Sequence, residues 1–179
     1  MDDFALRDAA VEDATLLSQL DIRSWRETYA GLLSDALLAG LEANPFHEPA
    51  YWVRLLSRSR RHRWIWIVGR DDPVGLCHFG AADDGGGVDR LYLLRAAQRR
   101  GFGRRLMSMA ARVLESHGLR PLTVWTLECN LPAQAFYERL GGLRLPRRPV
   151  FEDAGAPVFE VGFRWQRPEL LAGITAPRS

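Results

Sequence analysis

The segment from Val88 to Cys129 limits the fold more than any other, because a strand, a helix and a second strand follow one another there with short connections. Both strands, Val88 to Leu94 and Leu122 to Cys129, are rich in apolar and β-branched residues. Between them, apolar side chains recur at helical spacing until Gly118 stops the helix. A unit of this length implies two parallel strands joined by a right-handed crossover. We therefore expect a sheet that contains a parallel pair.

The rest of the chain predicts antiparallel strands around that pair. Two pairs of β-rich runs are each separated by a short turn sequence, DDP in the first pair and EDAGAP in the second, which is the pattern of a hairpin. The glycine-rich residues 83–87 are expected to form a mobile loop. Outside the parallel pair, the expected strands are residues 4–7, 64–68, 74–79, 143–151 and 158–165.

The helices are expected in three places. Before about Leu56 the apolar pattern is helical, but Pro45 and Pro49 interrupt it, so two or three short helices are expected there. A second helical pattern begins near Phe102, and a third runs from residue 132 to residue 140, where a Gly pair stops it.

Composition points to a globular protein. The chain has 179 residues, enough for one domain with a substantial core, and it is 47% hydrophobic with a formal net charge of only +2. This balance argues against disorder and against nucleic acid as a partner. Every Lys or Arg position is Arg, so no lysine amine is present to form a Schiff base or to be acylated.

The cysteines and the apolar runs indicate where in the cell the protein is expected. Cys77 and Cys129 both lie in β-rich apolar runs, where they are expected as core residues and not as a disulfide. No basic and apolar leader is present, and no apolar run reaches about 18 residues. We expect a reduced, cytoplasmic protein without a membrane span. The four histidines are scattered and suggest no metal site.

The stretch QRRGFGRRLM places Gly101 and Gly103 between a strand and a helix. Without a Cβ, the backbone there can turn several N–H groups toward one point, and the helix dipole adds positive potential. Phosphate oxygens are the natural occupants. The dinucleotide fingerprint is excluded because Leu106 stands where its third glycine belongs, and the triphosphate loop is excluded because it requires a lysine.

Two motifs resemble those of the GNAT superfamily, the acyl-CoA-dependent N-acyltransferases. Residues 98–103, QRRGFG, resemble its pyrophosphate signature, and residues 124–142, VWTLECNLPAQAFYERLGG, resemble its second signature. LYLL before the first motif and SWRETYAGLL near the N-terminus are also similar to segments of the family. The resemblance covers most of residues 4–165.

This resemblance implies an α/β (α+β) fold with a mixed, mostly antiparallel sheet of six to seven strands, flanked by helices and splayed where the two central parallel strands part. It also implies acetyl-CoA as the acyl donor. From the sequence we expect a single domain over residues 1–166 and a loose tail over residues 167–179. Backbone groups of Leu93 and Arg95 would pair with the pantetheine arm and polarise the thioester carbonyl. All the implied cofactor-binding positions are Leu93, Leu94, Arg95, Arg99, Arg100, Gly101, Phe102, Gly103, Arg104, Asn130, Ala133 and Phe136.

The resemblance places Tyr137 near the group that protonates the departing thiolate, a role that a phenol of pKa about 10 can fill. The general base stays open. Many relatives use a Glu at the position of Gly87, and the candidates here are Asp89, which strand alternation turns to the same face, and Glu128, which would share a face with Asn130. A chain of water molecules would also serve.

The predicted activity is transfer of an acetyl group to a primary amine of a small molecule or peptide by direct attack. Trp25 and Tyr29, four residues apart on one helical face, either line the acceptor pocket or belong to the core. Tyr137 and Asn130 likewise have purely structural alternatives. Two rival functions stay open, a non-catalytic acyl-CoA sensor and a nucleic-acid-binding module that uses Arg58 to Trp66. A homodimer is left open.

Overall fold

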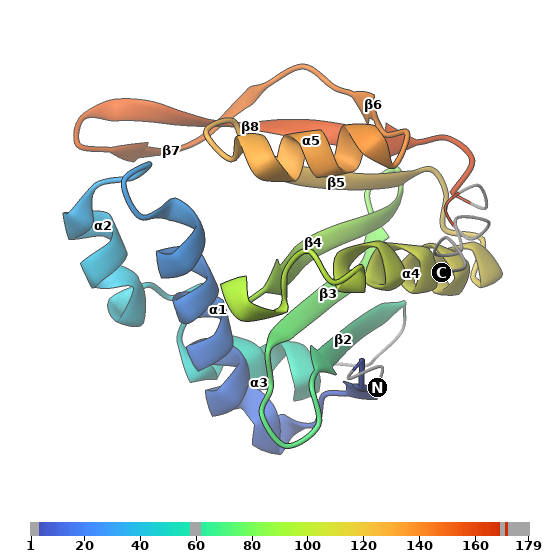
Figure 1. Ribbon diagram of the computed structural model, residues 1–179, viewed down its shortest axis with the longest axis horizontal. Coiled ribbons are helices and arrows are strands. Elements are labelled where there is room, and N and C mark those ends of the chain that lie inside the picture. Colours follow the sequence, from blue (N-terminus) through green and yellow to red (C-terminus); the bar gives the residue numbers. More distant parts are fainter. Residues whose placement is uncertain (1–3, 58–61, 169–170, 172–179) are drawn as a thin grey trace. The chain divides into compact units, whose positions relative to one another are not determined.

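The protein is described by a computed structural model in which residues 4–57, 62–168 and 171 are placed. Within these residues, eight strands form one sheet in the order β1-β2-β3-β4-β5-β8-β6, and β7 also pairs with β8. The elements are drawn in Figure 1, which labels the α-helices and every strand except β1. They are β1 (Leu6–Asp8), η1 (Val11–Asp13), α1 (Ala14–Tyr29), α2 (Asp35–Ala39), η2 (Gly40–Ala43), α3 (Pro49–Ser57), β2 (Arg63–Val68), β3 (Gly75–Ala82), β4 (Gly85–Leu93), η3 (Arg95–Ala97), α4 (Phe102–Ser116), β5 (Leu122–Leu127), α5 (Leu131–Arg139), β6 (Leu143–Arg144), β7 (Arg148–Asp153) and β8 (Ala156–Trp165).

The chain divides into two compact units, and β3 and β4 each run from one unit into the other. The first unit consists of residues 1–78 and 90–100, and the second of residues 79–89 and 101–179. The expectation of one domain over residues 1–166 stays a prediction, and most of the predicted tail lies outside the described residues. In the described part of the chain, no helix is both long enough and apolar enough to cross a membrane.

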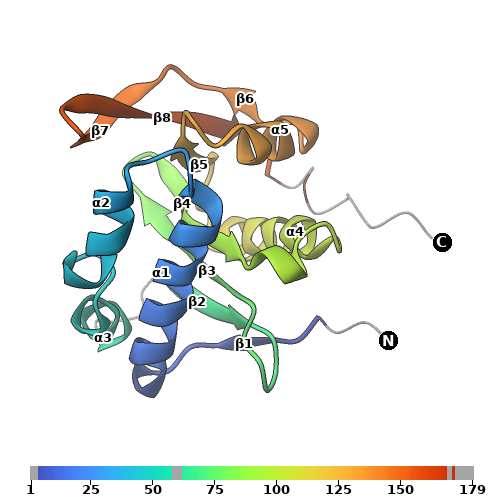
Figure 2. The same ribbon diagram turned by 60° about the vertical axis from the view of Figure 1, so that its left-hand side comes forward.

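The first unit is built around α1. Asp13 fixes η1, the turn directly before α1. Its carboxylate accepts a hydrogen bond from the Ala10 N–H at 2.8 Å and pairs with Arg7 at 2.7 Å. Leu17 and Leu20 lie on the buried face of α1, in one cluster with Trp52 of α3. Helices α1 and α3 pack against each other, as Figure 2 shows.

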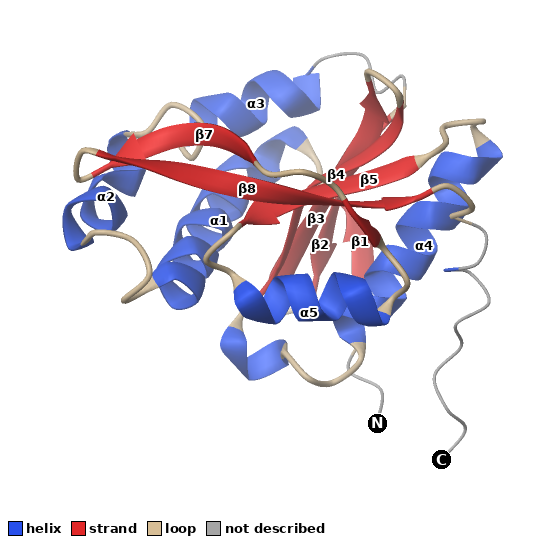
Figure 3. Ribbon diagram, turned by 90° about the horizontal axis from the view of Figure 1, so that it is seen from above, coloured by secondary structure: helices blue, strands red, loops and turns tan. Residues whose placement is uncertain are grey.

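The second unit contains the predicted parallel pair. Strands β4 and β5 pair in parallel from Gly86 opposite Leu122 to Val88 opposite Val124. The second half of β8 pairs with the whole length of β5 in antiparallel register. Strands β7 and β8 form the long hairpin of Figure 3. The mixed, mostly antiparallel sheet with a parallel pair is therefore confirmed.

Three details differ from the expectation. Residues 85–87 are not a loop but the start of β4. Glycine stands there because a Cβ on Gly85 would come within 2.3 Å of the Pro121 oxygen, an approach that only glycine allows. The expected strand from Leu143 to Phe151 is interrupted and becomes β6 and β7, both paired with β8, which gives the eighth strand. Strand β5 ends at Leu127, two residues earlier than expected.

Candidate active site

The glycine stretch forms an open helix N-terminus. Arg99 and Gly101 have left-handed backbone angles, with φ of 62° and 82°, and these turn the chain into α4. No side chain caps this helix, and its first backbone bond runs from the Arg105 N–H to the Gly101 oxygen at 3.1 Å. The N–H groups of Gly103 and Arg104 lie in the first turn, where a helix has no acceptor for them. This arrangement fits a phosphate group.

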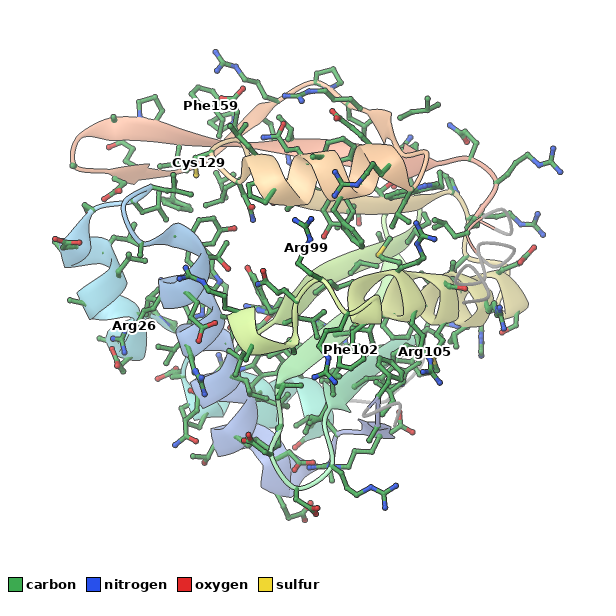
Figure 4. All side chains as sticks on the ribbon, in the orientation of Figure 1. Arg26, Arg99, Phe102, Arg105, Cys129 and Phe159 are labelled. Carbon is green, nitrogen blue, oxygen red and sulfur yellow. The ribbon has the colours of Figure 1, made fainter. Side chains whose placement is uncertain are left out.

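The space beside Gly101 is open. A Cβ placed on Gly101 would have no atom within 4 Å. Figure 4 labels Phe102 and Arg105, which lie on α4, and Arg99, which precedes it. Arg99 and Arg100 are exposed, whereas Phe102 is buried and anchors the first turn in the core.

Leu93, at the end of β4, is the first of the two residues whose backbone groups are predicted to meet the acyl donor. The Leu94 N–H donates to the Val74 oxygen at 2.8 Å, so the backbone groups of Leu93 point to the opposite edge of the strand. There the Leu93 oxygen accepts a hydrogen bond from Gln98 Nε2 at 2.8 Å. The Leu93 N–H is therefore the better candidate for a partner on the acyl donor.

The Arg95 N–H is already engaged. It donates to Glu27 Oε2 of α1 at 2.6 Å, and the Arg95 guanidinium donates to the Glu27 main-chain oxygen at 2.9 Å. The prediction gave this N–H a role in polarising the thioester. In the structure, the N–H could take that role only by leaving Glu27.

The parallel pairing of β4 and β5 ends early. Val88 and Val124 are the last residues in register, although β5 continues to Leu127 and remains paired with β8. The splay of the two strands beyond this point stays a prediction.

The residues after β5 form a cap instead of a strand end. Asn130 is buried, and its side-chain oxygen accepts a hydrogen bond from the Ala133 N–H at 3.2 Å, which caps α5. Because β5 stops at Leu127, Glu128 does not share a strand face with Asn130 as predicted. The Glu128 carboxylate instead pairs with Arg147 at 2.9 Å.

Tyr137 lies on the buried face of α5. The residue is 5% exposed, and its ring packs against Phe163 and Trp165, with ring centres 5.6 and 6.2 Å away. The Trp165 indole N–H donates to the Leu140 oxygen at 2.9 Å, which fixes the end of α5. Phe136 and Ala133, also predicted at the cofactor, are half-buried on the same helix.

Asp89 is exposed on β4. A Cβ placed on Gly87 would lie 3.9 Å from Asp89 Oδ1, so the two positions face the same side of the strand, as strand alternation predicted.

The two aromatic residues predicted at the acceptor differ in exposure. Tyr29 is 2% exposed and belongs to the core, whereas Trp25 is half-buried. Their ring centres are 4.8 Å apart, and the Trp25 ring also meets His47 edge-on at 5.0 Å.

A buried charged cluster was missed by the sequence analysis. It consists of Asp21 of α1, His47 before α3, Tyr51 of α3 and Arg90 of β4, all in the first unit. Burial opposes the charge on Arg90, but Asp21 and Tyr51 outweigh this and raise the pKa of its guanidinium. The only signal in the sequence was an Asp within an apolar helical stripe, which does not reveal its partners.

The cysteines, the metal-binding residue types and the Arg58 to Trp66 segment were also considered as sites. Both cysteines are free, and burial raises the pKa of the Cys129 thiol. Among the residues that the structure places, no group of three or more His, Cys, Asp and Glu could hold a metal ion. The first part of the Arg58 to Trp66 segment lies outside the described residues, and Trp66 is buried, so its ring is not available to stack on a base.

The profile of the family described as Acetyltransferase (GNAT) matches residues 21–142, which is more than half of the chain. An uncharacterized N-acetyltransferase of Bacillus subtilis, YuaI, is 31% identical over 172 residues, covering 93% of this chain and 94% of that protein. The chain belongs to the GNAT acetyltransferase family. A probable N-acetyltransferase of Mycobacterium tuberculosis, Rv2775, is also 31% identical, over 80% of this chain and 82% of the relative.

Solved structures show the same GNAT fold. A GCN5-related N-acetyltransferase from Rhodopseudomonas palustris superposes with a TM-score of 0.73 at 21% identity, covering 93% of this chain and 97% of that one. The PaiA N-acetyltransferase of Thermoplasma acidophilum, solved in complex with coenzyme A, superposes with a TM-score of 0.69 at 18% identity, covering 88% and 97%.

Proposed function

We propose that this GNAT protein transfers the acetyl group of acetyl-CoA to a primary amine of a small molecule or peptide. The observation that carries the proposal is the uncapped N-terminus of α4, preceded by left-handed backbone at Arg99 and Gly101. The N–H groups of the first turn of α4 and two exposed arginines before it suit the pyrophosphate of a coenzyme A thioester. The thioester supplies an acyl carbon that is open to attack by an amine.

The residues of the chain have distinct tasks in this reaction. The Leu93 N–H, held at the strand end by the bond from Gln98 to the Leu93 oxygen, donates to the developing negative charge on the thioester oxygen. Tyr137 gives its phenolic proton to the departing thiolate. Asn130 keeps α5, and with it Tyr137, in a fixed position through its cap.

Direct attack by the amine is favoured over an acyl-enzyme. Cys129 is the sole half-exposed thiol among the described residues, and burial raises its pKa, which disfavours the thiolate that an acyl-enzyme would require. The chain also contains no lysine, so no side-chain amine of the protein can intercept the acetyl group.

The experiment is thiol release from acetyl-CoA in the presence of a panel of amines, with the product identified by mass spectrometry. The panel contains polyamines, amino sugars, amino acids, arylalkylamines and short peptides. We expect one class to release thiol in step with the appearance of its acetylated product. Saturable acetyl-CoA binding without transfer to any class would favour the sensor instead.

A further inference from the structure

Helices α4 and α5 lie on the same face of the sheet in the second unit. The Tyr137 ring of α5 packs against Trp165 of β8, and a Cβ placed on Gly86 of β4 would lie 3.0 Å from Leu114 of α4. Both contacted strand residues belong to one face, because Leu122 of β5 lies opposite Gly86 in β4 and opposite Trp165 in β8. The other face of these strands is therefore turned away from both helices.

On this other face, a glycine gives an aromatic ring its room. Trp125 comes three residues after Leu122 in β5, so its side chain points away from α4 and α5. Its partner across the strand pair is Gly162 of β8. A Cβ placed on Gly162 would lie 3.1 Å from two carbons of the Trp125 ring. Because glycine has no such atom, the ring can extend over β8.

Arg148 of β7 lies on this ring. Its guanidinium carbon is 3.8 Å from the centre of the Trp125 ring, and its Nε donates to Glu160 Oε1 at 2.6 Å. Arg148 and Glu160 are also opposite each other in the β7–β8 hairpin that Figure 3 shows. The ring fixes the plane of the guanidinium and the carboxylate fixes one edge of it. The group is therefore oriented before a ligand arrives.

The guanidinium of Arg148 has further donors to offer. It carries five N–H groups, and the bond to Glu160 uses the one on Nε. The other four belong to the terminal nitrogens, whose fork matches the two oxygens of a carboxylate. The Arg148 side chain is 57% exposed, so a ligand can reach it. Because Glu160 already offsets the positive charge, a carboxylate with one negative charge suits this group better than a phosphate with two.

A candidate base lies on the same face of the sheet. Gly87 of β4 is opposite Thr123, which alternates with Trp125 along β5, so Gly87 and Trp125 share a face. The carboxylate of Asp89 points to the side of Gly87, with Oδ1 3.9 Å from a Cβ placed there. One face of the second unit thus carries a carboxylate that attracts an ammonium group and a guanidinium that binds a carboxylate. This charge pattern complements a ligand that has both groups.

We propose that the acceptor of the transfer reaction carries a carboxylate besides its amine, as an amino acid or a short peptide does, and that Arg148 binds this carboxylate; this rests on the proposed function. The two oxygens of the ligand accept hydrogen bonds from the terminal nitrogens of Arg148. Trp125 and Glu160 are positioning residues, because they act on the ligand only through the orientation of the guanidinium. The acceptor is therefore selected by its charge at the end remote from the reacting amine.

The neighbouring Arg147 provides a matched control. Its guanidinium also stacks on a ring, 4.2 Å from the centre of Phe159, and also pairs with a carboxylate, that of Glu128 at 2.9 Å. Phe159 and Glu160 are successive residues of β8, so they face opposite sides of the hairpin. A change at Arg147 therefore removes a similar set of contacts from the same hairpin without removing the proposed carboxylate site.

The test compares kcat/KM for matched pairs of acceptors that differ only in their charge: glycylglycine and glycylglycinamide, phenylalanine and phenylalaninamide, β-alanine and its amide. Aminoethylphosphonate replaces β-alanine in a further arm that separates phosphonate from carboxylate. For wild type we expect the carboxylate member of the best pair to be favoured at least about tenfold over the amide. In Arg148→Gln this preference should disappear, through a higher KM for the carboxylate, while the amide and the affinity for acetyl-CoA are unchanged.

Further variants separate recognition of the carboxylate from stability of the hairpin. Arg148→Lys keeps the charge without the fork and should retain part of the preference, and Trp125→Leu, which removes the stack, should lower it less than Arg148→Gln does. Arg147→Gln should keep the preference of wild type. A merely structural role of Arg148 would lower kcat/KM for both members of a pair equally.

Equal use of carboxylate and amide by wild type, a preference that persists in Arg148→Gln, or better use of aminoethylphosphonate than of β-alanine would overturn this assignment and leave the proposed function intact. Absence of transfer to any amine, with or without a carboxylate, would overturn the proposed function and this assignment with it.

Discussion

Gln98 Nε2 donates to the main-chain oxygen of Leu93 at 2.8 Å. The first residue of the glycine motif therefore holds the last residue of β4, five positions earlier in the chain. The family signature at this position thus has a local structural reason. It fixes the strand end that we propose to meet the thioester, next to the turn that we propose to meet the pyrophosphate.

Loss of this hydrogen bond should weaken acetyl-CoA binding. In Gln98→Met the Leu93 oxygen loses its donor, and we expect the dissociation constant to rise by about threefold to tenfold, equivalent to about 0.5–1.5 kcal/mol. Calorimetric titration checks this, with the exposed Gln19 of α1 changed to Met as control. Equal affinities for the two variants would show that Gln98 does not organise the donor site.

The proposed role of Tyr137 separates catalysis from binding. Tyr137→Phe keeps the ring that packs against Phe163 but removes the proton given to the thiolate. We expect kcat to fall by about 100-fold or more with the acetyl-CoA dissociation constant unchanged. The measurement is steady-state kinetics with titration of the same sample. Wild-type turnover at saturating substrates would reject Tyr137 as the acid.

Cys129 should be dispensable. Burial raises the pKa of its thiol, so the nucleophilic thiolate is disfavoured. We expect Cys129→Ser to change kcat by less than about twofold. Intact-protein mass spectrometry of wild type with acetyl-CoA adds a second check, which the absence of lysine makes easy to interpret. An acetyl adduct that disappears in the variant would indicate an acyl-enzyme and contradict direct transfer.

His78 should make stability depend on pH. Burial, with the charges of Arg90 and Arg63, lowers the pKa of His78 to about 3, compared with 6.5 in the unfolded chain. Between these values the unfolded state holds one proton more than the folded state, so falling pH destabilises the fold by about 1.4 kcal/mol per unit from this group. At pH above 6.5 the effect is absent.

Urea unfolding at several pH values between about 4.5 and 6 tests this. In His78→Leu the slope of unfolding free energy against pH should be smaller than that of wild type by one proton. Parallel slopes for the two proteins would mean that His78 can be protonated in the folded state over this range.

The sequence predicted those parts of the fold that depend on local patterns. Helix α4 was expected from near Phe102 to Gly118 and runs from Phe102 to Ser116, because apolar spacing and a stop glycine act within a few residues. Residues 85–87 were misassigned because glycine is typical of loops. The reason for glycine there is contact with Pro121 and Leu114, which sequence spacing does not show.

In the candidate site, too, the sequence predicted what depends on contiguous motifs and missed what depends on distant contacts. The glycine turn and Asn130 could be located because their motifs are contiguous. Asp21 and Arg90 are 69 positions apart, and Asp21 and His47 are 26 apart, so only the folded chain brings them together. The pairing of Glu128 with Arg147 and of the Arg95 N–H with Glu27 was equally beyond local patterns.

The most direct test of the account is calorimetric titration of acetyl-CoA into wild type, Gly103→Glu and the matched control Gly40→Glu. Gly40 is exposed, and a Cβ there would have no atom within 4 Å, so its variant should bind as wild type. Gly103→Glu places a carboxylate at the N–H groups of α4, and we expect affinity to fall more than about tenfold with the fold retained. Equal binding by all three proteins, or no binding by wild type, would contradict the assignment of this turn as the pyrophosphate site.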